Sequence, residues 1–153
     1  VESDITIATS NGLARMNFNE TSVINFTEST GDAEYSGIIT NGINSSGPLT
    51  QNKVYYVTTG GVWDAADSAT NEDHASHMLG LSVGTNPVTN GMLLKGFFGS
   101  ESHGFTKGAP LYLSTNGTYT NSVPGSGWAR ICGYAVTDDA IYFDPSKTYV
   151  EIA

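Results

Sequence analysis

The sequence contains two copies of one short pattern, and this internal repeat limits the chain to folds that two similar halves can build. The copies span residues 49–84 and 105–136. Five positions agree in type at one constant offset: Thr50 and Thr106, Tyr56 and Tyr112, Thr59 and Thr115, Gly61 and Gly117, and Trp63 and Tyr119. Each copy also ends in an apolar segment that a glycine interrupts. We therefore expect one structural unit that occurs twice.

The second copy predicts a β-hairpin. Apolar residues alternate with Tyr112 and Ser114, Asn116-Gly117 supplies the two positive-φ positions of a tight type I′ turn, and residues 118–120 lead back. In the first copy, Gly60-Gly61 stands at the turn. A glycine inside a strand usually marks a bulge or a close backbone crossing, which we expect in the apolar segments that end the two copies.

The composition favours an all-β fold. The chain has 18 glycines and only 14% charged residues, and strong helix formers are scarce. We expect a small barrel-like or sandwich domain built from the two hairpin units, and we prefer the barrel because each unit is too small to bury both faces alone. Residues 64–78 form either a short helix or a loop, and residues 92–98, the most apolar strand, should lie centrally in the core.

The first 45 residues differ in texture from the rest. Their apolar alternations are short and sparse, and Ser45-Ser46-Gly47-Pro48 is the best candidate boundary. We expect residues 1–45 to form an extended β arm and residues 46–153 to form the compact domain. Wrapping of several arms into a shaft would give a homotrimer, because oligomerisation covers segments that cannot fill their own core. An edge strand within one monomer is the alternative. Since Val1 is not a methionine, we expect the chain to belong to a longer product.

Charge and hydropathy argue against two classes of partner. The formal net charge is −9, and the six basic residues are scattered singly, so we expect no binding of nucleic acid. The same negative field disfavours anionic membrane surfaces. No apolar run approaches the ~20 residues of a spanning helix, so we expect no membrane insertion. The single cysteine, Cys132, excludes an internal disulfide and should be a small buried side chain.

Two histidines three residues apart, His74 and His77, are the only candidates for a metal site. On a helix they would share a face near Asp73, but the HExxH arrangement is absent and a solvated loop explains them as well. Asp64 and Asp67 lack the alternating pattern of a calcium loop. We therefore expect no metal.

Catalytic signatures are also missing from the sequence. Ser100, Ser102 and His103 lie in a glycine-flanked loop without a nucleophile elbow, and the glycines do not form a phosphate loop or a dinucleotide fingerprint. We expect no cofactor and no catalytic residues. A hydrolase built around His103 or the acidic loop is the weaker alternative.

The aromatic residues are the remaining candidates for recognition. Most should be core residues or cross-strand partners. Trp128 follows a Pro-Gly-Ser-Gly loop, so its ring should reach the surface and could stack on a sugar or anchor a partner subunit. Tyr119 and Trp63, which occupy equivalent positions in the two copies, are further candidates for surface recognition.

Residues 49–152 resemble a module found at the C-terminal end of virion proteins of tailed bacteriophages, cyanophages and other marine phages among them. The resemblance is carried by VYYV at 54–57, GVW at 61–63, DAAD at 64–67, LG at 79–80, GMLLKGF at 91–97, GAPLYLS at 108–114, RICGY at 130–134 and IYFDPSKTYVEI at 141–152. It implies a structural role on the particle, as a tail fibre, a spike or a capsid-surface component, often oligomeric. It implies no catalytic residues, and residues before 45 lie outside it.

Three functions remain open from the sequence. The first is a non-enzymatic virion protein, a homotrimer that contacts other virion proteins or a host-surface glycan. The second is a monomeric carbohydrate-binding module that uses Trp128. The third is the hydrolase. The sequence does not distinguish a fibre tip from capsid decoration.

Overall fold

The described residues form one eleven-stranded antiparallel sheet, so the all-β prediction is confirmed. The computed structural model describes residues 28–30, 33–99 and 102–153. Its strands are β1 (Glu28–Thr30), β2 (Ala33–Thr40), β3 (Val54–Val57), β4 (Trp63–Ala65), β5 (Leu79–Ser82), β6 (Met92–Gly99), β7 (Pro110–Leu113), β8 (Tyr119–Thr120), β9 (Gly127–Ala135), β10 (Ala140–Phe143) and β11 (Tyr149–Ile152). The described residues also contain a short helix α1 (Asp73–Ser76), within the predicted segment 64–78, and a 3-10 turn η1 (Thr115–Gly117).

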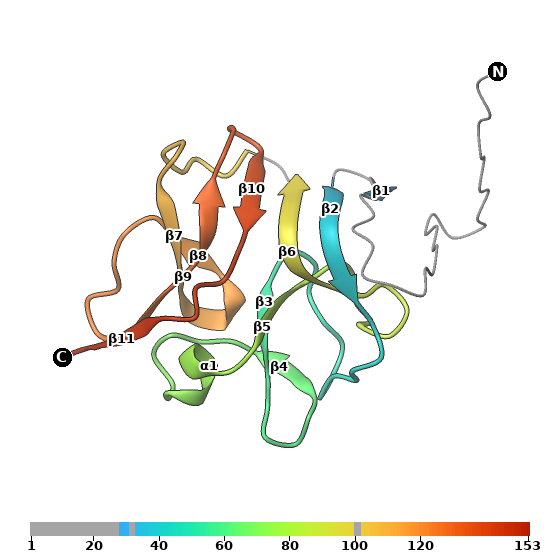
Figure 1. Ribbon diagram of the computed structural model, residues 1–153, viewed down its shortest axis with the longest axis horizontal. Coiled ribbons are helices and arrows are strands. Elements are labelled where there is room, and N and C mark those ends of the chain that lie inside the picture. The colour runs from blue at the N-terminus through green and yellow to red at the C-terminus, as the bar shows by residue number, and fades with distance from the viewer. Residues whose placement is uncertain (1–27, 31–32, 100–101) are drawn as a thin grey trace.

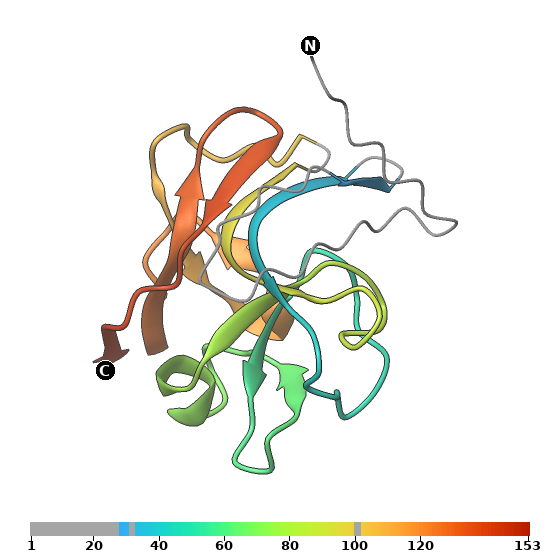
Figure 2. The ribbon, with the colours of Figure 1, turned by 45° about the vertical axis from the view of Figure 1, so that its right-hand side comes forward.

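The two sequence copies occupy corresponding places in the sheet. The strand order is β4-β3-β5-β6-β10-β9-β7-β8, so β3 lies between β4 and β5 just as β7 lies between β8 and β9. Strands β6 and β10, which lie outside both copies, pair with each other and connect the first unit to the second within the sheet (Figure 1). The sheet curls on itself, as Figure 2 shows, and forms a half-barrel rather than two stacked layers.

The predicted turn in the second hairpin is confirmed. Asn116 and Gly117 both have positive φ, 51° and 68°, and the Thr118 amide donates to the Thr115 carbonyl at 3.1 Å. Two equivalent hydrogen bonds close the hairpin loops: Thr58 N–H to Val62 O at 2.9 Å, and Ser114 N–H to Thr118 O at 2.9 Å.

Strand β6 joins the two halves of the sheet. Along one edge it pairs with β2 over its whole length. Along the other edge it pairs first with β5, through Leu93 and Leu81, and then with β10, through Phe98 and Ile141. One segment of eight residues therefore pairs with β2, with β5 of the first unit and with β10, which in turn pairs with β9 of the second unit.

Two glycines face each other where β2 crosses β6. Gly37 and Gly96 are directly paired, with φ of 142° and 148°, a region that L side chains rarely adopt. A Cβ added to Gly96 would lie 2.7 Å from the Gly37 Cα and would also collide with the Ser36 carbonyl oxygen. The close crossing of the two strands therefore requires glycine on both.

The predicted boundary at residues 45 and 46 is wrong for residues 33–45. Strand β2 is part of the sheet, Tyr35 is only 1% exposed in the core, and Trp63 donates its amide to the Asn44 carbonyl at 2.8 Å. For this stretch the edge-strand alternative holds, since the sparse apolar residues of β2 complement those of β6. The shaft expected for residues 1–27 lies outside the described residues.

The core consists of two adjoining clusters. The larger one includes Phe98, Phe143 and Cys132, and the smaller one surrounds Trp63 and Met92. Cys132 is fully buried, as expected, and burial raises the pKa of its thiol to about 12. This thiol is therefore protonated and unreactive near neutral pH.

Replacing Gly96 by alanine should destabilise the fold by on the order of 3 kcal/mol, because the added methyl group meets the β2 backbone and the positive φ becomes strained. The check is a chemical unfolding curve of the G96A variant. The control is Gly125→Ala, an exposed position with open space around the added Cβ, which should change stability by less than about 0.5 kcal/mol. A G96A protein as stable as G125A would contradict this account of the crossing.

Candidate functional site

Three aromatic side chains line up on the outer face of the sheet. Phe97 of β6, Tyr142 of β10 and Tyr134 of β9 are directly opposite one another in the strand register. Phe97 is 48% exposed and Tyr134 is 42% exposed, while Tyr142 is half-buried between them. The Phe97 and Tyr142 rings are 4.8 Å apart, tilted by 41°. We call Phe97, Tyr142 and Tyr134 the outer aromatic row.

Side-chain alternation places this row outside. Phe98 and Ile141, the chain neighbours of Phe97 and Tyr142, point into the core. Strand β6 lies in the middle of the sheet, as expected for residues 92–98, but its Lys95 and Phe97 side chains are exposed on the outer face. The signal that could have revealed the row is the Phe97-Phe98 pair itself, because adjacent residues of a strand face opposite sides.

A charged pair borders the row. Lys95 Nζ lies 3.2 Å from Asp144 Oδ2, and both side chains are partly exposed. The hydrogen bond that the Lys95 ammonium donates to Asp144 raises the pKa of Lys95, and the nearby Tyr142 adds to that effect.

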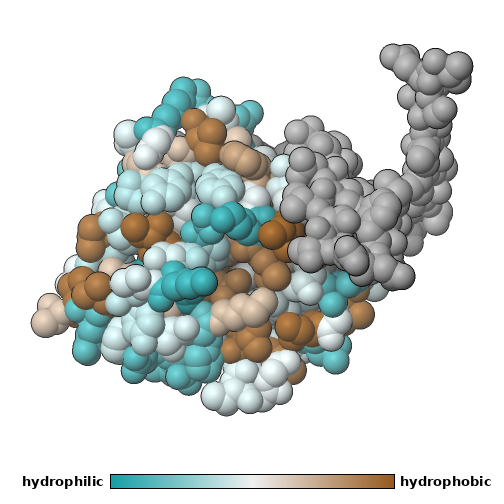
Figure 3. All heavy atoms as spheres, in the orientation of Figure 1, coloured by the Kyte–Doolittle hydropathy of each residue, from teal (hydrophilic) through white to brown (hydrophobic). Residues whose placement is uncertain are grey.

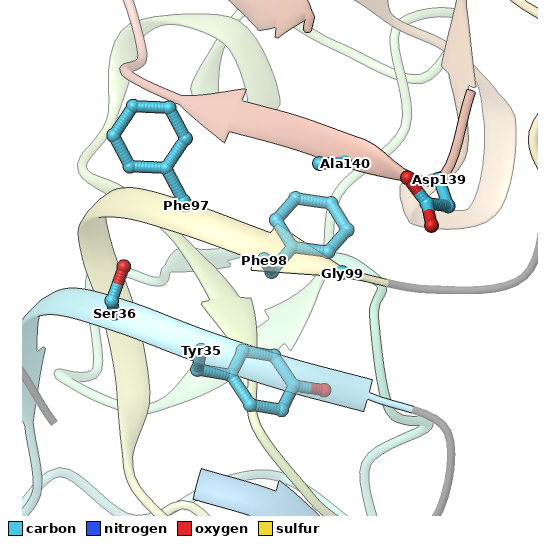
Figure 4. A pocket seen from close by; sticks show the side chains of 7 residues that line it. All are labelled: Tyr35, Ser36, Phe97, Phe98, Gly99, Asp139 and Ala140. Carbon is cyan, nitrogen blue, oxygen red and sulfur yellow. The ribbon is translucent and has the colours of Figure 1, made fainter. Parts of the chain in front are cut away.

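A small pocket opens at the end of β6, next to the row. Its volume is about 230 Å³, and seven residues line it: Tyr35, Ser36, Phe97, Phe98, Gly99, Asp139 and Ala140 (Figure 4). The rings of Tyr35 and Phe98 are stacked with their centres 6.4 Å apart. Asp139 is exposed at the start of β10 and is the only charged residue of the lining. The pocket therefore combines apolar walls with one carboxylate.

The expectation of surface recognition is wrong for Trp63. Trp63 is 1% exposed, and its ring covers Gly80 so closely that a Cβ there would lie 2.8 Å from it. The glycine in this strand therefore makes room for the indole, which is part of the core.

Tyr119 is likewise not a surface-recognition residue. Its ring packs against the core 6.1 Å from that of Phe98, and its hydroxyl is buried without a hydrogen-bond partner. Trp63 and Tyr119 come from equivalent hairpins, and both hairpins turn this position inward. Which face of a hairpin is covered depends on the rest of the sheet and not on the hairpin residues alone.

Trp128 lies partly exposed near the start of β9. Its ring meets that of Tyr149 on β11 in an edge contact, with centres 6.0 Å apart. The Tyr149 hydroxyl donates to Glu72 Oε1 at 2.7 Å, and this hydrogen bond raises the pKa of Tyr149. Trp128 and Tyr149 thus form a second aromatic surface, away from the outer aromatic row.

Arg130 is a structural residue that the sequence analysis did not single out. It is 7% exposed and donates to three backbone carbonyls: those of Ala75 at 2.6 Å, His77 at 2.5 Å and Ser146 at 2.7 Å. Burial lowers the pKa of its guanidinium. The sequence could have indicated this role, because Arg130 lies inside the apolar segment 129–136 and a buried arginine needs hydrogen-bond partners.

His74 and His77 have structural partners. His74 Nδ1 accepts a hydrogen bond from the Asp67 amide at 3.0 Å, and its ring stacks on Tyr56 with centres 4.1 Å apart. His77 Nδ1 lies 2.8 Å from the Val57 carbonyl, as a donor in the matching tautomer. Within residues 28–30, 33–99 and 102–153, no three histidine, cysteine or acidic side chains are grouped to hold a metal ion.

His103 packs against Phe105. Its ring stacks on Phe105, with centres 5.1 Å apart, and its Nδ1 accepts from the Phe105 amide at 3.1 Å. Ser100, the other serine of the predicted loop, lies outside the described residues. The hydrolase hypothesis gains no geometric support from His103.

Comparison with known proteins adds no relative: no family model, no curated protein and no solved structure matches the chain. The resemblance to phage virion modules therefore rests on the motifs quoted above. Within the described part of the chain, no helix has the length and apolar character needed to cross a membrane. Figure 3 shows one face of the molecule, on which hydrophobic atoms are interspersed with hydrophilic ones.

Replacing Tyr119 by phenylalanine should stabilise the fold by about 1 kcal/mol, because it removes a buried hydroxyl that has no partner. The matched control is Tyr35→Phe, which removes a hydroxyl that donates to Asn52 Oδ1 at 2.5 Å and should be destabilising. Unfolding curves of both variants provide the check, and a loss of stability in Y119F would show that its hydroxyl is satisfied.

The stability of the fold should fall on acidification, partly through His74. Burial lowers the pKa of this imidazole below its usual value of 6.5, so the unfolded chain takes up the proton first. His74 therefore stabilises the native state above about pH 6.5 and loses this contribution as the pH falls through its lower native pKa. His74→Asn keeps an acceptor for the Asp67 amide and should show a smaller loss between pH 7 and pH 5. Equal losses in thermal melts would contradict the assignment.

Proposed function

We propose that this chain is a non-enzymatic structural protein of a bacteriophage particle, which contributes to assembly or to attachment at the host surface. It acts in the virion as a homotrimer whose copies meet at the outer aromatic row. The resemblance to phage virion modules supports this proposal, and the resembling motifs contribute to strands β3 to β7 and β9 to β11 of the sheet.

The observation that carries the proposal is the exposure of the row. An antiparallel sheet with one solvated face normally places polar residues there. Here Phe97 and Tyr134 keep nearly half of their surfaces open, at 48% and 42%. Aromatic side chains are enriched in the cores of protein interfaces, and exposed apolar groups gathered in one place mark interaction sites. Assembly would cover the row.

The test is the mass of the full chain in solution by light scattering. We expect three times the chain mass of 16.1 kDa for the natural sequence, and the monomer mass for a variant that combines Phe97→Ser and Tyr134→Ser. The two substitutions remove the exposed rings at the two ends of the row. Loss of an aromatic side chain at the centre of an interface typically costs about 2 kcal/mol or more of binding free energy.

The matched control is Val123→Ser, which removes another exposed apolar side chain, 57% exposed, from the loop between β8 and β9. This variant should keep the mass of the natural chain, and all proteins should show the same thermal melt. A monomeric natural chain would contradict the assembly role. An oligomer that survives the double substitution would show that copies meet elsewhere.

A monomeric carbohydrate-binding module is the second candidate. The Trp128–Tyr149 pair favours it, since two partly exposed rings lie beside the Glu72 carboxylate, which can accept hydrogen bonds from sugar hydroxyls. The mass measurement separates the two functions, because this candidate requires neither the row nor an oligomer.

A further inference from the structure

The pocket beside the outer aromatic row has the chemistry to accept one basic side chain. Its volume of about 230 Å³ is below the 300 Å³ or more typical of sites for drug-sized ligands. The half-exposed Phe97 ring and the short Ala140 side chain offer apolar contact, and the exposed Asp139 supplies the charge, whereas the Tyr35 and Phe98 rings are buried in the core. A lysine can lay its aliphatic stem along such walls while its ammonium group reaches a carboxylate.

Asp139 is not neutralised by its own chain within the described residues. One carboxylate oxygen accepts a hydrogen bond from the Thr137 hydroxyl at 2.6 Å, and none of the ion pairs includes it. The neighbouring cation, Lys107, pairs with Asp138 at 2.8 Å. The carboxylate at this position therefore favours contact with a positively charged group.

One basic residue of the described chain is free to reach another copy. Lys95 and Lys107 are paired with carboxylates, Arg130 is buried, and Lys53 is half-buried. Lys147 is exposed in the turn between β10 and β11, and no described carboxylate pairs with it. Charge complementarity therefore favours Lys147 as the donor.

We propose that the pocket receives Lys147 of a neighbouring copy when the chain assembles. The proposal rests on the proposed function, in which copies meet at the row. Asp139 immediately precedes β10, and Lys147 follows its other end. Donor and acceptor therefore lie beyond opposite ends of one strand that crosses the row, so each copy can give its lysine to one neighbour and accept one from another. Such head-to-tail contacts close into a ring when the rotation between copies allows it.

Charge exchange tests the proposal on the full chain. Asp139→Lys and Lys147→Glu should each raise the dissociation constant of the oligomer by about tenfold or more, because each leaves two like charges facing each other. The combination D139K with K147E restores opposite charges and should recover most of the affinity. The measurement is light scattering over a dilution series, with melting curves to verify folding.

Asp138→Asn and Lys53→Gln are the matched controls. D138N removes a neighbouring negative charge that Lys107 already pairs with, and K53Q removes the half-buried lysine. Both should leave the oligomer unchanged. Single charge reversals that leave association intact, or a double variant that does not recover, would overturn the proposal. A natural chain that is oligomeric and row-dependent but insensitive to these charges would overturn the pocket contact alone, whereas a monomeric natural chain would overturn both proposals.

Discussion

The close contact of Gly37 with Gly96 determines how the rest of the sheet is arranged. At this point β2 and β6 approach so closely that neither can carry a Cβ, and both chains take a φ that glycine alone adopts easily. The same segment of β6 changes partner on its other edge, from β5 to β10. A few residues of β6 thus set the curvature of the sheet, the pairing with β10 that connects its two halves, and the pairing with β2.

The two repeat units also contact each other directly, at a place away from β6. The amide of Gly117, in the turn of the second hairpin, donates to the Ala66 carbonyl of the first unit at 2.6 Å. Gly117 also packs against the Val54 backbone, so a side chain there would collide with β3. Gly117 is thus required both by the turn conformation and by the contact between the units. This double requirement explains why the strong turn motif Asn116-Gly117 lies here.

The sequence predicted local structure well and three-dimensional placement poorly. The hairpins, the Asn116-Gly117 turn and the buried Cys132 depend on neighbouring residues, which a sequence displays directly. The attachment of β2 depends on complementarity with a strand far along the chain. Which face of each strand is covered depends on the curl of the sheet, so Trp63 was misplaced and the outer aromatic row was overlooked. The pocket was equally out of reach, since it joins three separate strands or their ends.

Arg130 ties together two surface segments that are remote in sequence. Its guanidinium binds carbonyls at the end of α1 and in the turn before β11, and Tyr149 of β11 reaches back to Glu72 beside α1. If either segment opens, the arginine loses partners for a charge that burial already penalises. The helix and the last strand should therefore open together, as one cooperative unit in amide hydrogen exchange. The amide protons of β11 would then be protected from exchange by the free energy needed to open the whole unit, and not only by the pairing of β11 with β9.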